Sequence, residues 1–382
     1  MLQCKWGIRM NAREIRLAIF GIGNCASSLV QAIIGSRDRD DQRGLESTVI
    51  GGYKLGDVRV VLAYDVSAKK VGCDLRDAMA AAPNCTTNYF DVGAQDLEVR
   101  PGLLADGLDG PLSALIKPHA LCAGRAISDI ESELRSAEID VAVCYLPTGS
   151  RQDARNYSVA ACRAGVAFIN ACPEAIMHDK ELRSMFERAG VPLLGDDMKS
   201  HAGATALHTL LIEFFSSRNI HVDHTYQLNI GGNADFKNLA DQARSASKRN
   251  SKRAALEGAG IESDVDILAG PTGFVPFLQD RKIAYIRLEG TSVLGMKLNI
   301  EARLDVEDSP NVVSVIADAI RIAMLTRQTP TSAREACAHL FKNPLIPVPH
   351  STAHSAYVRL VQHLNGDIPL QPILEMHDDH DS

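Results

Sequence analysis

The chain has 382 residues, enough for two domains with a large hydrophobic core, and its 46% hydrophobic and 23% charged residues are ordinary for a globular protein. The formal net charge of −7 at pH 7 argues against general nucleic-acid binding, which depends on clustered Lys and Arg, although a small phosphorylated substrate needs only a local group of cations. The sequence has no run of about 18 apolar residues, so no membrane span is expected.

The first half of the chain alternates strand-like and helix-like segments. An apolar strand is expected at residues 15–20, followed by a glycine turn and a helix over about 26–34, and the polar residues 35–57 are predicted to form a long loop. A helix over residues 151–164 is expected to stop at Gly165. Further buried strands are predicted at residues 58–65, 141–146, 166–171 and 191–196. Strands that alternate with helices predict βαβ units and a parallel sheet.

The pattern changes after about residue 200. Residues 297–306 (KLNIEARLDV) alternate strictly between apolar and polar side chains, which is typical of a strand in an antiparallel sheet with one polar face. Residues 225–230 and 282–289 are its expected partners. Ser309 and Pro310 suit a helix start, with Ser309 as the cap and Pro310 in the first turn.

These patterns together predict an α/β fold, a Rossmann-type parallel sheet that carries an inserted α+β domain. The expected boundaries are residues 11–200 for the sheet domain and 201–308 for the insertion. Residues 309–382 are expected to return to the first domain and to end in a disordered tail, HDDHDS. No spacing of His, Cys and Asp along the chain identifies a metal-ligand set.

A dinucleotide fingerprint is the clearest local motif. The segment GIGNCA, residues 21–26, follows a predicted strand and opens a predicted helix. Gly21 permits the tight turn, Gly23 lets the backbone approach a diphosphate, and Ala26 fills the third small position, while the helix N-terminus offers N–H groups to the anion. Asp65 ends the next strand, where a carboxylate would bind the ribose hydroxyls and favour NAD over NADP. The alternative is a strand–helix turn that binds no nucleotide.

Polar clusters that packing alone does not demand occupy the second half. They are residues 195–205 (GDDMKSHAGAT), 229–236 (NIGGNADF), 247–252 (SKRNSK), 280–282 (DRK), 307–311 (EDSPN) and 341–344 (FKNP). Lys248 and Lys252 are four residues apart, which on a helix places both ammonium groups on one face. Taken singly, each lysine is equally a solvated surface charge, the Asp196–Asp197 pair a strand-end turn, and Ser200 a helix cap.

Nine cysteines are scattered along the chain without a CxxC pair, and several stand in apolar stretches, as Cys144 does in VAVCYL. This distribution is typical of free thiols in a reducing compartment and not of a disulfide framework or a zinc site. The N-terminal segment lacks the apolar core of a signal peptide. A cytoplasmic protein is therefore expected.

The sequence resembles the myo-inositol-1-phosphate synthase family in its short bacterial form, from about Arg16 to Pro347. The motifs that carry the resemblance are GIGNCASSLVQ, GGYKLGDV, YLPTGS, GVAFINACP, GDDMKS, LNIGGNADF, SKRNSK, DRKIAYIRLEG and DSPN. The acid in position 65 follows the glycines by more than the usual spacing of about 20 residues, and the long loop that causes this is also a feature of the family.

The resemblance implies conversion of glucose 6-phosphate to an inositol phosphate by NAD-mediated oxidation at C5, enolisation, aldol closure and reduction. It implies that the insertion is the catalytic domain and forms a homotetramer, and that the product feeds phospholipid, thiol or aminocyclitol synthesis. The residues implied to bind NAD are Gly21, Gly23, Asn24, Cys25, Ala26, Ser27, Asp65, Leu146, Thr148, Asn170 and Asp197. Those implied to bind the substrate phosphate are Ser200, Gly203, Ala204, Thr205 and Lys252, and those around the reacting carbons are Lys248, Lys282, Lys342, Asp308, Asp197 and Asp235. A divalent or monovalent cation could assist at the phosphate or the enolate oxygen.

Three positions depart from the family pattern. His201 stands where the short bacterial forms have Gln, Gln279 replaces an acid, and the spacer of SKRNSK is changed. None of these changes removes a group that the mechanism requires. The alternatives are an NAD-dependent sugar-phosphate or polyol-phosphate dehydrogenase, a catalytically silent NAD-binding paralogue, and a Schiff-base aldolase, which the resemblance does not favour.

Overall fold

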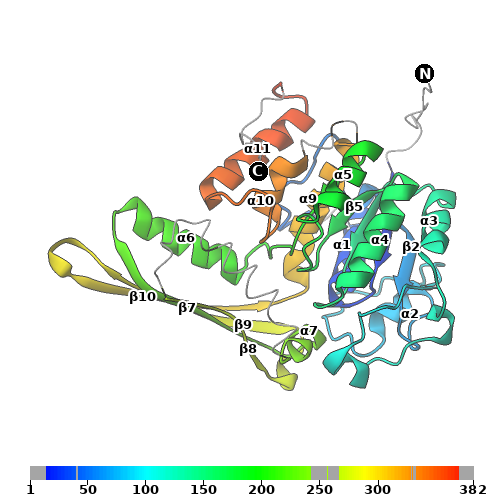
Figure 1. Cartoon of the computed structure of the whole chain (residues 1–382), viewed down its shortest axis with the longest axis horizontal. Helices are drawn as coiled ribbons and strands as arrows, with labels where there is room; N and C mark the ends of the chain where they lie inside the picture. Colours follow the sequence, from blue (N-terminus) through cyan, green and yellow to red (C-terminus); the bar gives the residue numbers. More distant parts are fainter. Residues whose placement is uncertain are drawn as a thin grey trace.

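The computed structural model describes residues 14–39, 42–241, 266–327 and 333–369, together with 256 and 329. Within these residues the chain forms a six-stranded sheet, order β3-β2-β1-β4-β5-β6, and a four-stranded sheet, order β10-β9-β7-β8. Helices flank the first sheet, and the second sheet extends away from it as a long curved layer (Figure 1). The described cysteines are all free thiols, as expected.

The first sheet is parallel in every pairing. Its strands are β1 (Ile15–Phe20), β2 (Val58–Asp65), β3 (Arg100–Pro101), β4 (Val141–Cys144), β5 (Ala167–Asn170) and β6 (Leu193–Leu194). The strands follow the chain in one direction from β1 to β3 and in the opposite direction from β4 to β6, so the order reverses between β1 and β4, which lie side by side at the centre of the sheet. In such sheets ligands bind beyond the carboxyl ends of the strands at this switch point. The predicted α/β class and Rossmann-type sheet are confirmed.

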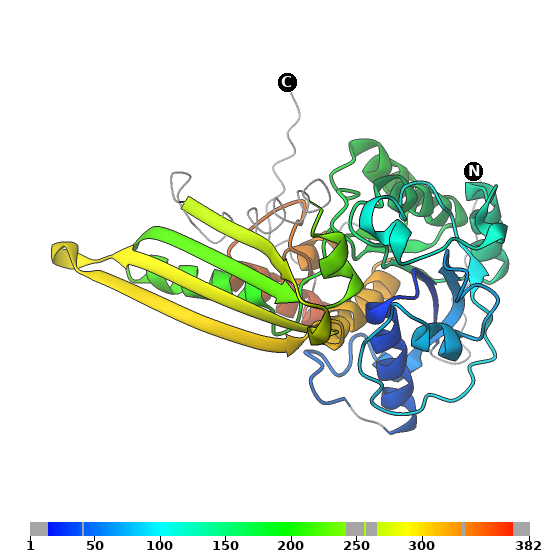
Figure 2. The ribbon, with the colours of Figure 1, turned by 90° about the horizontal axis from the view of Figure 1, so that it is seen from below.

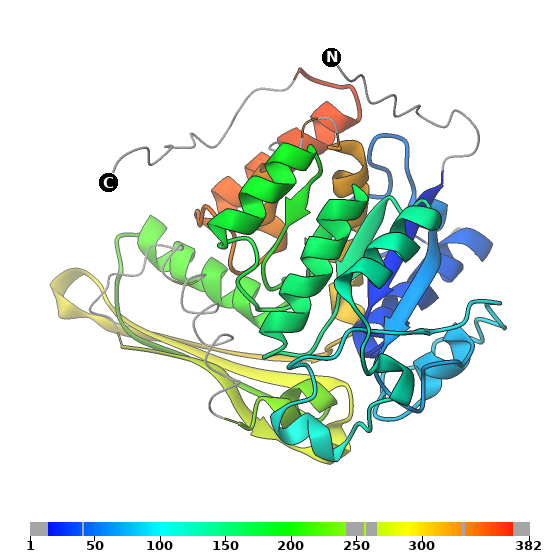
Figure 3. The same cartoon turned by 45° about the vertical axis from the view of Figure 1, so that its right-hand side comes forward.

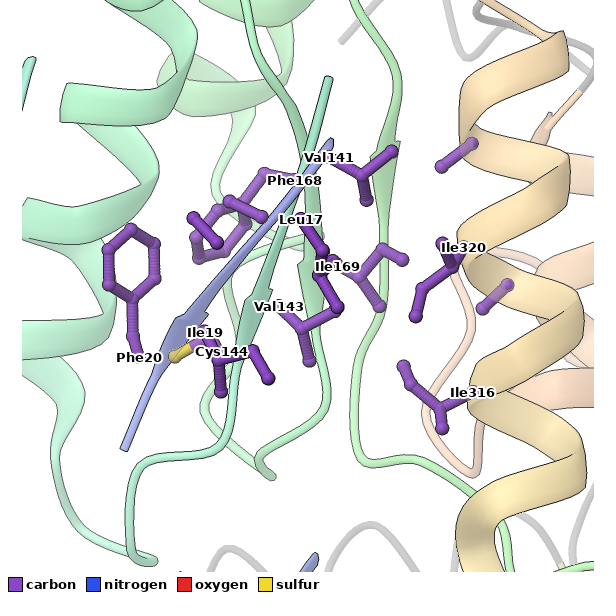
Figure 4. Packing of buried hydrophobic residues seen from close by; sticks show 14 of the residues in the cluster. Leu17, Ile19, Phe20, Val141, Val143, Cys144, Phe168, Ile169, Ile316 and Ile320 are labelled. Atoms are coloured by element: carbon purple, nitrogen blue, oxygen red, sulfur yellow. The ribbon is translucent and has the colours of Figure 1, made fainter. Parts of the chain in front are cut away.

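Apolar helices cover both faces of this sheet. They are α1 (Asn24–Asp38), α2 (Leu75–Ala80), α3 (Ile127–Ser136), α4 (Arg151–Ala164), α5 (Lys180–Ala189), α9 (Val313–Leu325), α10 (Ala333–Leu340) and α11 (His350–Leu364). On one face Ile316 and Ile320 of α9 point toward Val143 and Ile169 of the strands (Figure 4). On the other, Phe20 stacks on Tyr157 of α4 with ring centroids 4.1 Å apart. The chain beyond the second sheet thus completes the core of the first.

Helix α1 is longer than predicted. It starts at Asn24 and runs to Asp38, so the expected loop over 35–57 is wrong at its beginning. Gly35 continues the helix because its missing side chain makes room for the Phe90 ring, which a Cβ at that position would meet at 3.2 Å. Helix α4 ends at Gly165, which adopts the left-handed conformation with φ 74° as expected for a helix stop.

The second sheet consists of β7 (His221–Gly231), β8 (Asp266–Phe274), β9 (Arg281–Thr291) and β10 (Lys297–Glu307). The alternating strand is confirmed as β10, but its only neighbour in the described sheet is β9, and the segment expected at 225–230 pairs with the other edge of β9. The expected antiparallel pairing is confirmed between β10 and β9 and between β9 and β7, but β8 runs parallel to β7, so the sheet is mixed. The sequence contains no turn signal that predicts the pairing of β8 with β7.

Helix α6 (Ala204–Ser217) covers one face of the second sheet, where Ile212 and Phe215 pack with Leu288. Helices α10 and α11 pack beside α9, and α11 also contacts α6 (Figure 3). The β9–β10 hairpin protrudes furthest from the first sheet (Figure 2). Its tip residues Val293 and Leu294 are 74% and 100% exposed. Short 3-10 helices occupy Leu55–Asp57, Gly110–Ala114, Ala120–Cys122, Pro276–Leu278, Val293–Gly295 and Pro310–Val312, and α7 is Ala234–Asn238.

The start of the last helical segment differs from the expected capping pattern. Pro310 does begin a 3-10 helix that leads into α9, but the Ser309 side chain caps nothing. Its hydroxyl instead donates to Asp280 Oδ1 at 2.9 Å, so the residue serves the site described below. None of the helices in the described part of the chain combines the length and the apolar composition of a membrane span.

Arg321 of α9 is fully buried and ties the segment after α1 to the core. Its guanidinium donates to the carbonyls of Ser47, at 2.7 Å, and Thr48, at 3.1 Å, and pairs with the buried carboxylate of Asp318.

Replacing Arg321 with Met is expected to lower the free energy of unfolding by about 3–5 kcal/mol, because Asp318 would stay buried without its partner. Chemical denaturation measures this. Arg135→Met, which breaks an exposed pair with Glu131, should cost at most about 1 kcal/mol, and an equal effect of the two would contradict the assignment.

Candidate active site

The turn between β1 and α1 has the backbone that a dinucleotide requires. Gly21 has φ +92°, and a Cβ there would meet the carbonyl oxygen of Tyr145 at 2.8 Å, so only glycine fits. Its N–H donates to Tyr64 O, which holds the turn against β2. Gly23 is the N-cap of α1 and no side chain caps the helix, so the first-turn N–H groups face away from the helix without an internal acceptor.

The open space beside Gly23 indicates whether this turn could bind a diphosphate. A Cβ built on Gly23 would meet no atom within 4 Å, in contrast to the tight surroundings of Gly21. An open approach to the backbone, combined with uncapped N–H groups at a helix N-terminus, suits an anionic group. The residues present therefore fit the diphosphate of NAD.

Asp65 lies at the carboxyl end of β2, next to this turn. Its Oδ2 accepts the Ile22 N–H at 3.0 Å, and its Oδ1 accepts the N–H groups of Val66 and Ser67, both at 2.8 Å. A carboxylate has about four acceptor positions, so these bonds fix its orientation and leave about one for a ribose hydroxyl. The buried Lys70, which the sequence did not single out, donates to Ile22 O at 2.6 Å and stiffens the same turn. Burial lowers the pKa of Lys70.

A polar pocket lies between the first sheet and the second. The residues that line it are Lys199, Ser200, Gly203, Ala204, Thr205, Ala206, Gln227, Asn229, Asp235, Phe236, Leu239, Pro271, Lys282, Asp308 and Lys342. Eight of the implied substrate-site residues are among them, drawn from the β6–α6 segment, α7, β9, the loop after β10 and the loop after α10. Lys248 and Lys252 lie outside the described residues.

Two lysine–carboxylate pairs define the chemistry of the pocket. Lys282 Nζ on β9 donates to Asp308 Oδ1 at 2.9 Å. Lys342 Nζ donates to Asp197 Oδ1 at 2.7 Å and to Met198 O at 2.8 Å. All four side chains are at least three-quarters buried. Preorganised ammonium groups in such surroundings can stabilise negative charge that develops on oxygen and can transfer protons.

Asp280, which the sequence analysis quoted only within a polar cluster, links the two halves of the site. It is 4% exposed, and its Oδ1 accepts hydrogen bonds from Asn24 of the glycine turn at 3.3 Å and from Asn233 at 3.0 Å. Asn233 also approaches Asp308 Oδ2, at 3.5 Å. A continuous set of polar contacts therefore connects the α1 N-terminus to Lys282. Burial raises the pKa of Asp280, and the neighbouring Asp308 raises it further.

Lys199 is a third lysine of the pocket, and the sequence analysis quoted it only within the cluster of residues 195–205 and gave it no role. Its Nζ donates to Ala338 O at 2.7 Å. Burial lowers its pKa to about 8, and the positive charge of Lys342 acts in the same direction. The signal that could have found it is its place beside Ser200, immediately before the turn that leads into α6.

The segment from Ser200 to Thr205 forms the N-terminus of α6. Gly203 is the N-cap, without a side-chain cap, and a Cβ there would meet Ser200 at 3.0 Å, so the turn is tight. Asn311 holds the turn in place, because its carbonyl accepts the His201 N–H at 2.7 Å and its side chain accepts the Ala202 N–H at 2.9 Å. A 14-residue helix whose N-terminus opens onto a pocket with three lysines suits a phosphate group.

The remaining implied cofactor residues lie after β4, at the end of β5 and in the first turn of α1. Thr148 follows β4, and its hydroxyl donates to Asp235 Oδ1 at 3.2 Å, which joins the two sheets at the site. Asn170 ends β5 but is fully buried, and its amide donates to Glu174 O and Asp196 Oδ1, so its role is to shape the loops around it. Ala26 and Ser27 are also buried, beneath the turn, whereas Leu146 is half-buried. Burial raises the pKa of Cys25 to about 12, so its thiol stays protonated.

Known proteins match the chain over most of its length. A model of the myo-inositol-1-phosphate synthase family matches residues 203–309. The chain is 41% identical to the inositol-3-phosphate synthase of Corynebacterium glutamicum, over 90% of this chain and 97% of that protein. It is also 41% identical to the inositol-3-phosphate synthase of Mycolicibacterium smegmatis, over 87% of this chain and 94% of that protein.

Two solved structures extend the likeness to the fold. Ari2 is 33% identical, with a TM-score of 0.73 over 92% of this chain and 98% of Ari2. The inositol-3-phosphate synthase of Caenorhabditis elegans is 18% identical, with a TM-score of 0.71 over 93% of this chain and 86% of that one, which is a likeness of fold.

Proposed function

The chain belongs to the myo-inositol-1-phosphate synthase family, and we propose that it converts D-glucose 6-phosphate to 1L-myo-inositol 1-phosphate with NAD as its cofactor. In this reaction C5 is oxidised and later reduced again, so there is no net redox change and the enzyme is an isomerase of the intramolecular lyase type. The observation that carries the proposal is that Lys282, Asp308 and Lys342 line one pocket beside a dinucleotide turn, where Lys282 pairs with Asp308 and Lys342 pairs with Asp197 behind the lining.

The cofactor supplies the removal of a hydride from C5 and its return after ring closure. We propose that the turn at Gly21 and Gly23 and the first turn of α1 hold its diphosphate, and that Asp65 binds the ribose. Thr148 and Asp197 would border the nicotinamide, because Thr148 bonds to Asp235 and Asp197 pairs with Lys342, both of which line the pocket.

The substrate phosphate would bind at the N-terminus of α6, where Ser200, Gly203, Ala204 and Thr205 surround the helix end. The helix dipole and the positive charge of Lys199 both favour a dianion there. Lys252 is proposed to assist, as the resemblance implies. With the phosphate fixed, the sugar carbons would extend toward the two lysine–carboxylate pairs.

The lysines would handle the charge and the protons of the three chemical steps. We propose that Lys282, in its neutral amine form and held by Asp308, takes the proton of the C5 hydroxyl and gives it back when the ketone is reduced. The ketone acidifies the C6 protons, and Lys342, Lys199 and Lys248 would stabilise the enolate oxygen and the alkoxide of the aldol step. Such electrostatic stabilisation typically contributes several kcal/mol, about 2.7–4 per donor. A cation at the phosphate or enolate oxygen is part of the proposal.

We further propose a cytoplasmic homotetramer whose product is a precursor for phospholipids. The support for the oligomer is the face of the second sheet opposite α6, where the apolar side chains of Leu268 and Tyr285 are 58% and 41% exposed. Exposed apolar residues gathered on one sheet face are typical of a subunit interface.

The product assay tests this function. Purified protein incubated with NAD⁺ and glucose 6-phosphate should form inositol phosphate without net accumulation of NADH. NADH without inositol phosphate would indicate a sugar-phosphate dehydrogenase instead, and NAD binding without any product would indicate a silent paralogue.

Exchanging His201 for the family's Gln is expected to change kcat/KM for glucose 6-phosphate by less than about threefold, under about 0.7 kcal/mol. The reason is that the His201 side chain is exposed and the residue is held in the α6 turn through its backbone N–H. Steady-state kinetics of His201→Gln measure this, with Thr205→Ala, at the buried end of the turn, as the variant that should raise KM. A tenfold or larger effect of His201→Gln would show that the departure has changed substrate recognition.

A further inference from the structure

Three histidines and one glutamate that do not line the substrate pocket converge on one another. Glu46 lies in the segment after α1, His339 on α10, and His350 and His354 one turn apart on α11. Glu46 Oε1 is 2.8 Å from His339 Nε2 and 3.6 Å from His354 Nδ1. The three side chains of Glu46, His339 and His354 offer one ligand atom each, and these atoms all lie within 4.8 Å of one another.

These separations suit a transition-metal ion. Nitrogen and oxygen ligands of Zn²⁺ lie about 2.0–2.2 Å from the metal, and at a tetrahedral angle two such atoms are about 3.3 Å apart. The distances of 2.8 and 3.6 Å bracket that value. Two imidazoles and one carboxylate, with a further position open, are a ligand set typical of zinc, whereas Mg²⁺ prefers oxygen ligands alone.

A hydrogen bond between His339 and Glu46 explains only part of the cluster. It does not account for His354, which approaches the same carboxylate oxygen from α11. The His350 ring adds a fourth imidazole, with its centroid 6.0 Å from that of His339 and 6.4 Å from that of His354. The ring nitrogen of a neutral imidazole is a common metal ligand.

The burial of the three side chains is graded from inside to outside. The His339 and Glu46 side chains are 11% and 21% exposed, and His354 is 51% exposed. An ion could therefore enter past His354 and be held by two ligands that are already fixed in the protein.

We propose that Glu46, His339 and His354 form a binding site for a divalent transition-metal ion of the zinc class, separate from the substrate pocket. The ion bridges three segments, the loop after α1, α10 and α11. His350 or a water completes the coordination. In the sequence, only the His350–His354 spacing of four residues on one helix gives a sign of this site, because Glu46 and His339 are 293 residues apart.

The site also bears on the substrate pocket through the end of α10. The carbonyl oxygen of Ala338, the residue before His339, accepts a hydrogen bond from Lys199 Nζ at 2.7 Å. The carbonyl oxygen of Leu340, the residue after His339, accepts one from the Lys199 backbone N–H at 2.9 Å. A metal that fixes His339 would thereby fix the helix turn that orients Lys199. The ion is expected to be structural, without contact to the substrate.

The test is metal binding by the full-length protein in the absence of substrate. Protein stripped with a chelator is titrated with Zn²⁺ in competition with a chromophoric indicator, and with Co²⁺ to record its ligand-field absorption. The variants are Glu46→Gln and His354→Asn, with His363→Asn, at the far end of α11, as the matched control. The wild type and His363→Asn should bind one Zn²⁺ more per chain than the other two, or bind it at least about tenfold more tightly.

Differences between variants are decisive because other metal sites in the chain contribute equally to all of them. A thermal midpoint near that of the metal-free wild type shows that a variant is folded, and Zn²⁺ should raise this midpoint less in Glu46→Gln and His354→Asn than in the control. Equal stoichiometry, affinity and Co²⁺ spectra in the wild type, Glu46→Gln and His354→Asn would overturn the proposal. Because no turnover is measured, the outcome is independent of the proposed synthase activity.

Discussion

Replacing Lys282 with Met is expected to lower kcat for inositol phosphate formation by about 10²–10⁴-fold, the range of general acid–base catalysis. Lys282 Nζ is 2.9 Å from Asp308 Oδ1 in the pocket, and the side chain is 18% exposed, so solvent has limited access to its position. Met keeps the length and the apolar stem but carries no proton. The measurement is the steady-state rate of product formation at saturating glucose 6-phosphate and NAD⁺.

Two comparisons show what Lys282 does. Lys282→Arg keeps the charge but cannot release a proton near neutral pH, so it should be nearly as slow as Lys282→Met if Lys282 carries the proton. Lys297→Met, at the other end of the same pair of strands and 70% exposed, should keep normal turnover. Near-normal kcat in Lys282→Met would remove Lys282 from the mechanism, and full activity of Lys282→Arg would reduce its role to electrostatics.

Changing Gly23 to Val is expected to weaken NAD binding at least about a hundredfold, 2.7 kcal/mol or more, while the thermal midpoint stays within a few degrees of the wild type. A Cβ at Gly23 meets no protein atom within 4 Å, and its φ of −88° suits any residue, so the fold accepts the side chain. The branched side chain would instead fill the space through which a diphosphate reaches the helix N-terminus. Calorimetric titration with NAD⁺ measures the effect.

Gly21→Ala provides the contrast to this variant. At Gly21 a Cβ would meet Tyr145 O at 2.8 Å and φ is +92°, so the substitution should destabilise the protein itself. Unchanged NAD affinity in Gly23→Val, with the protein folded, would mean that the cofactor does not approach this turn. The pair of variants therefore separates a binding role from a folding role within one motif.

The elements around the cofactor turn could be predicted from the sequence because local signals agree there. β1 and β2 lie at the predicted residues, since each is a short apolar run bounded by turn residues. The end of α1 could not be predicted, because tertiary packing of Gly35 against Phe90 outweighs the helix-breaking tendency of glycine. The parallel pairing of β7 and β8 depends on segments far apart in sequence, for which no local pattern exists.

The candidate site was predictable only in part, for a related reason. Lys342 and Asp197 are 145 residues apart, and their contact follows from the fold, so spacing alone leaves each lysine an ordinary surface charge. The resemblance to a family supplied the grouping. It assigned no role to Asp280 or Lys199, although both stand within its motifs. Their importance lies in what they contact: Asp280 joins Asn24 to Asn233, and Lys199 donates to a carbonyl at the end of α10.

The most direct test of the proposed chemistry follows a deuterium label on C5 of glucose 6-phosphate through turnover with NAD⁺ and an excess of added unlabelled NADH. If oxidation and reduction take place within one closed site on one bound cofactor, mass spectrometry should find the deuterium retained in nearly all of the inositol phosphate. Loss of the label from the product, or its appearance in free NADH, would contradict an internal redox cycle and with it the central claim.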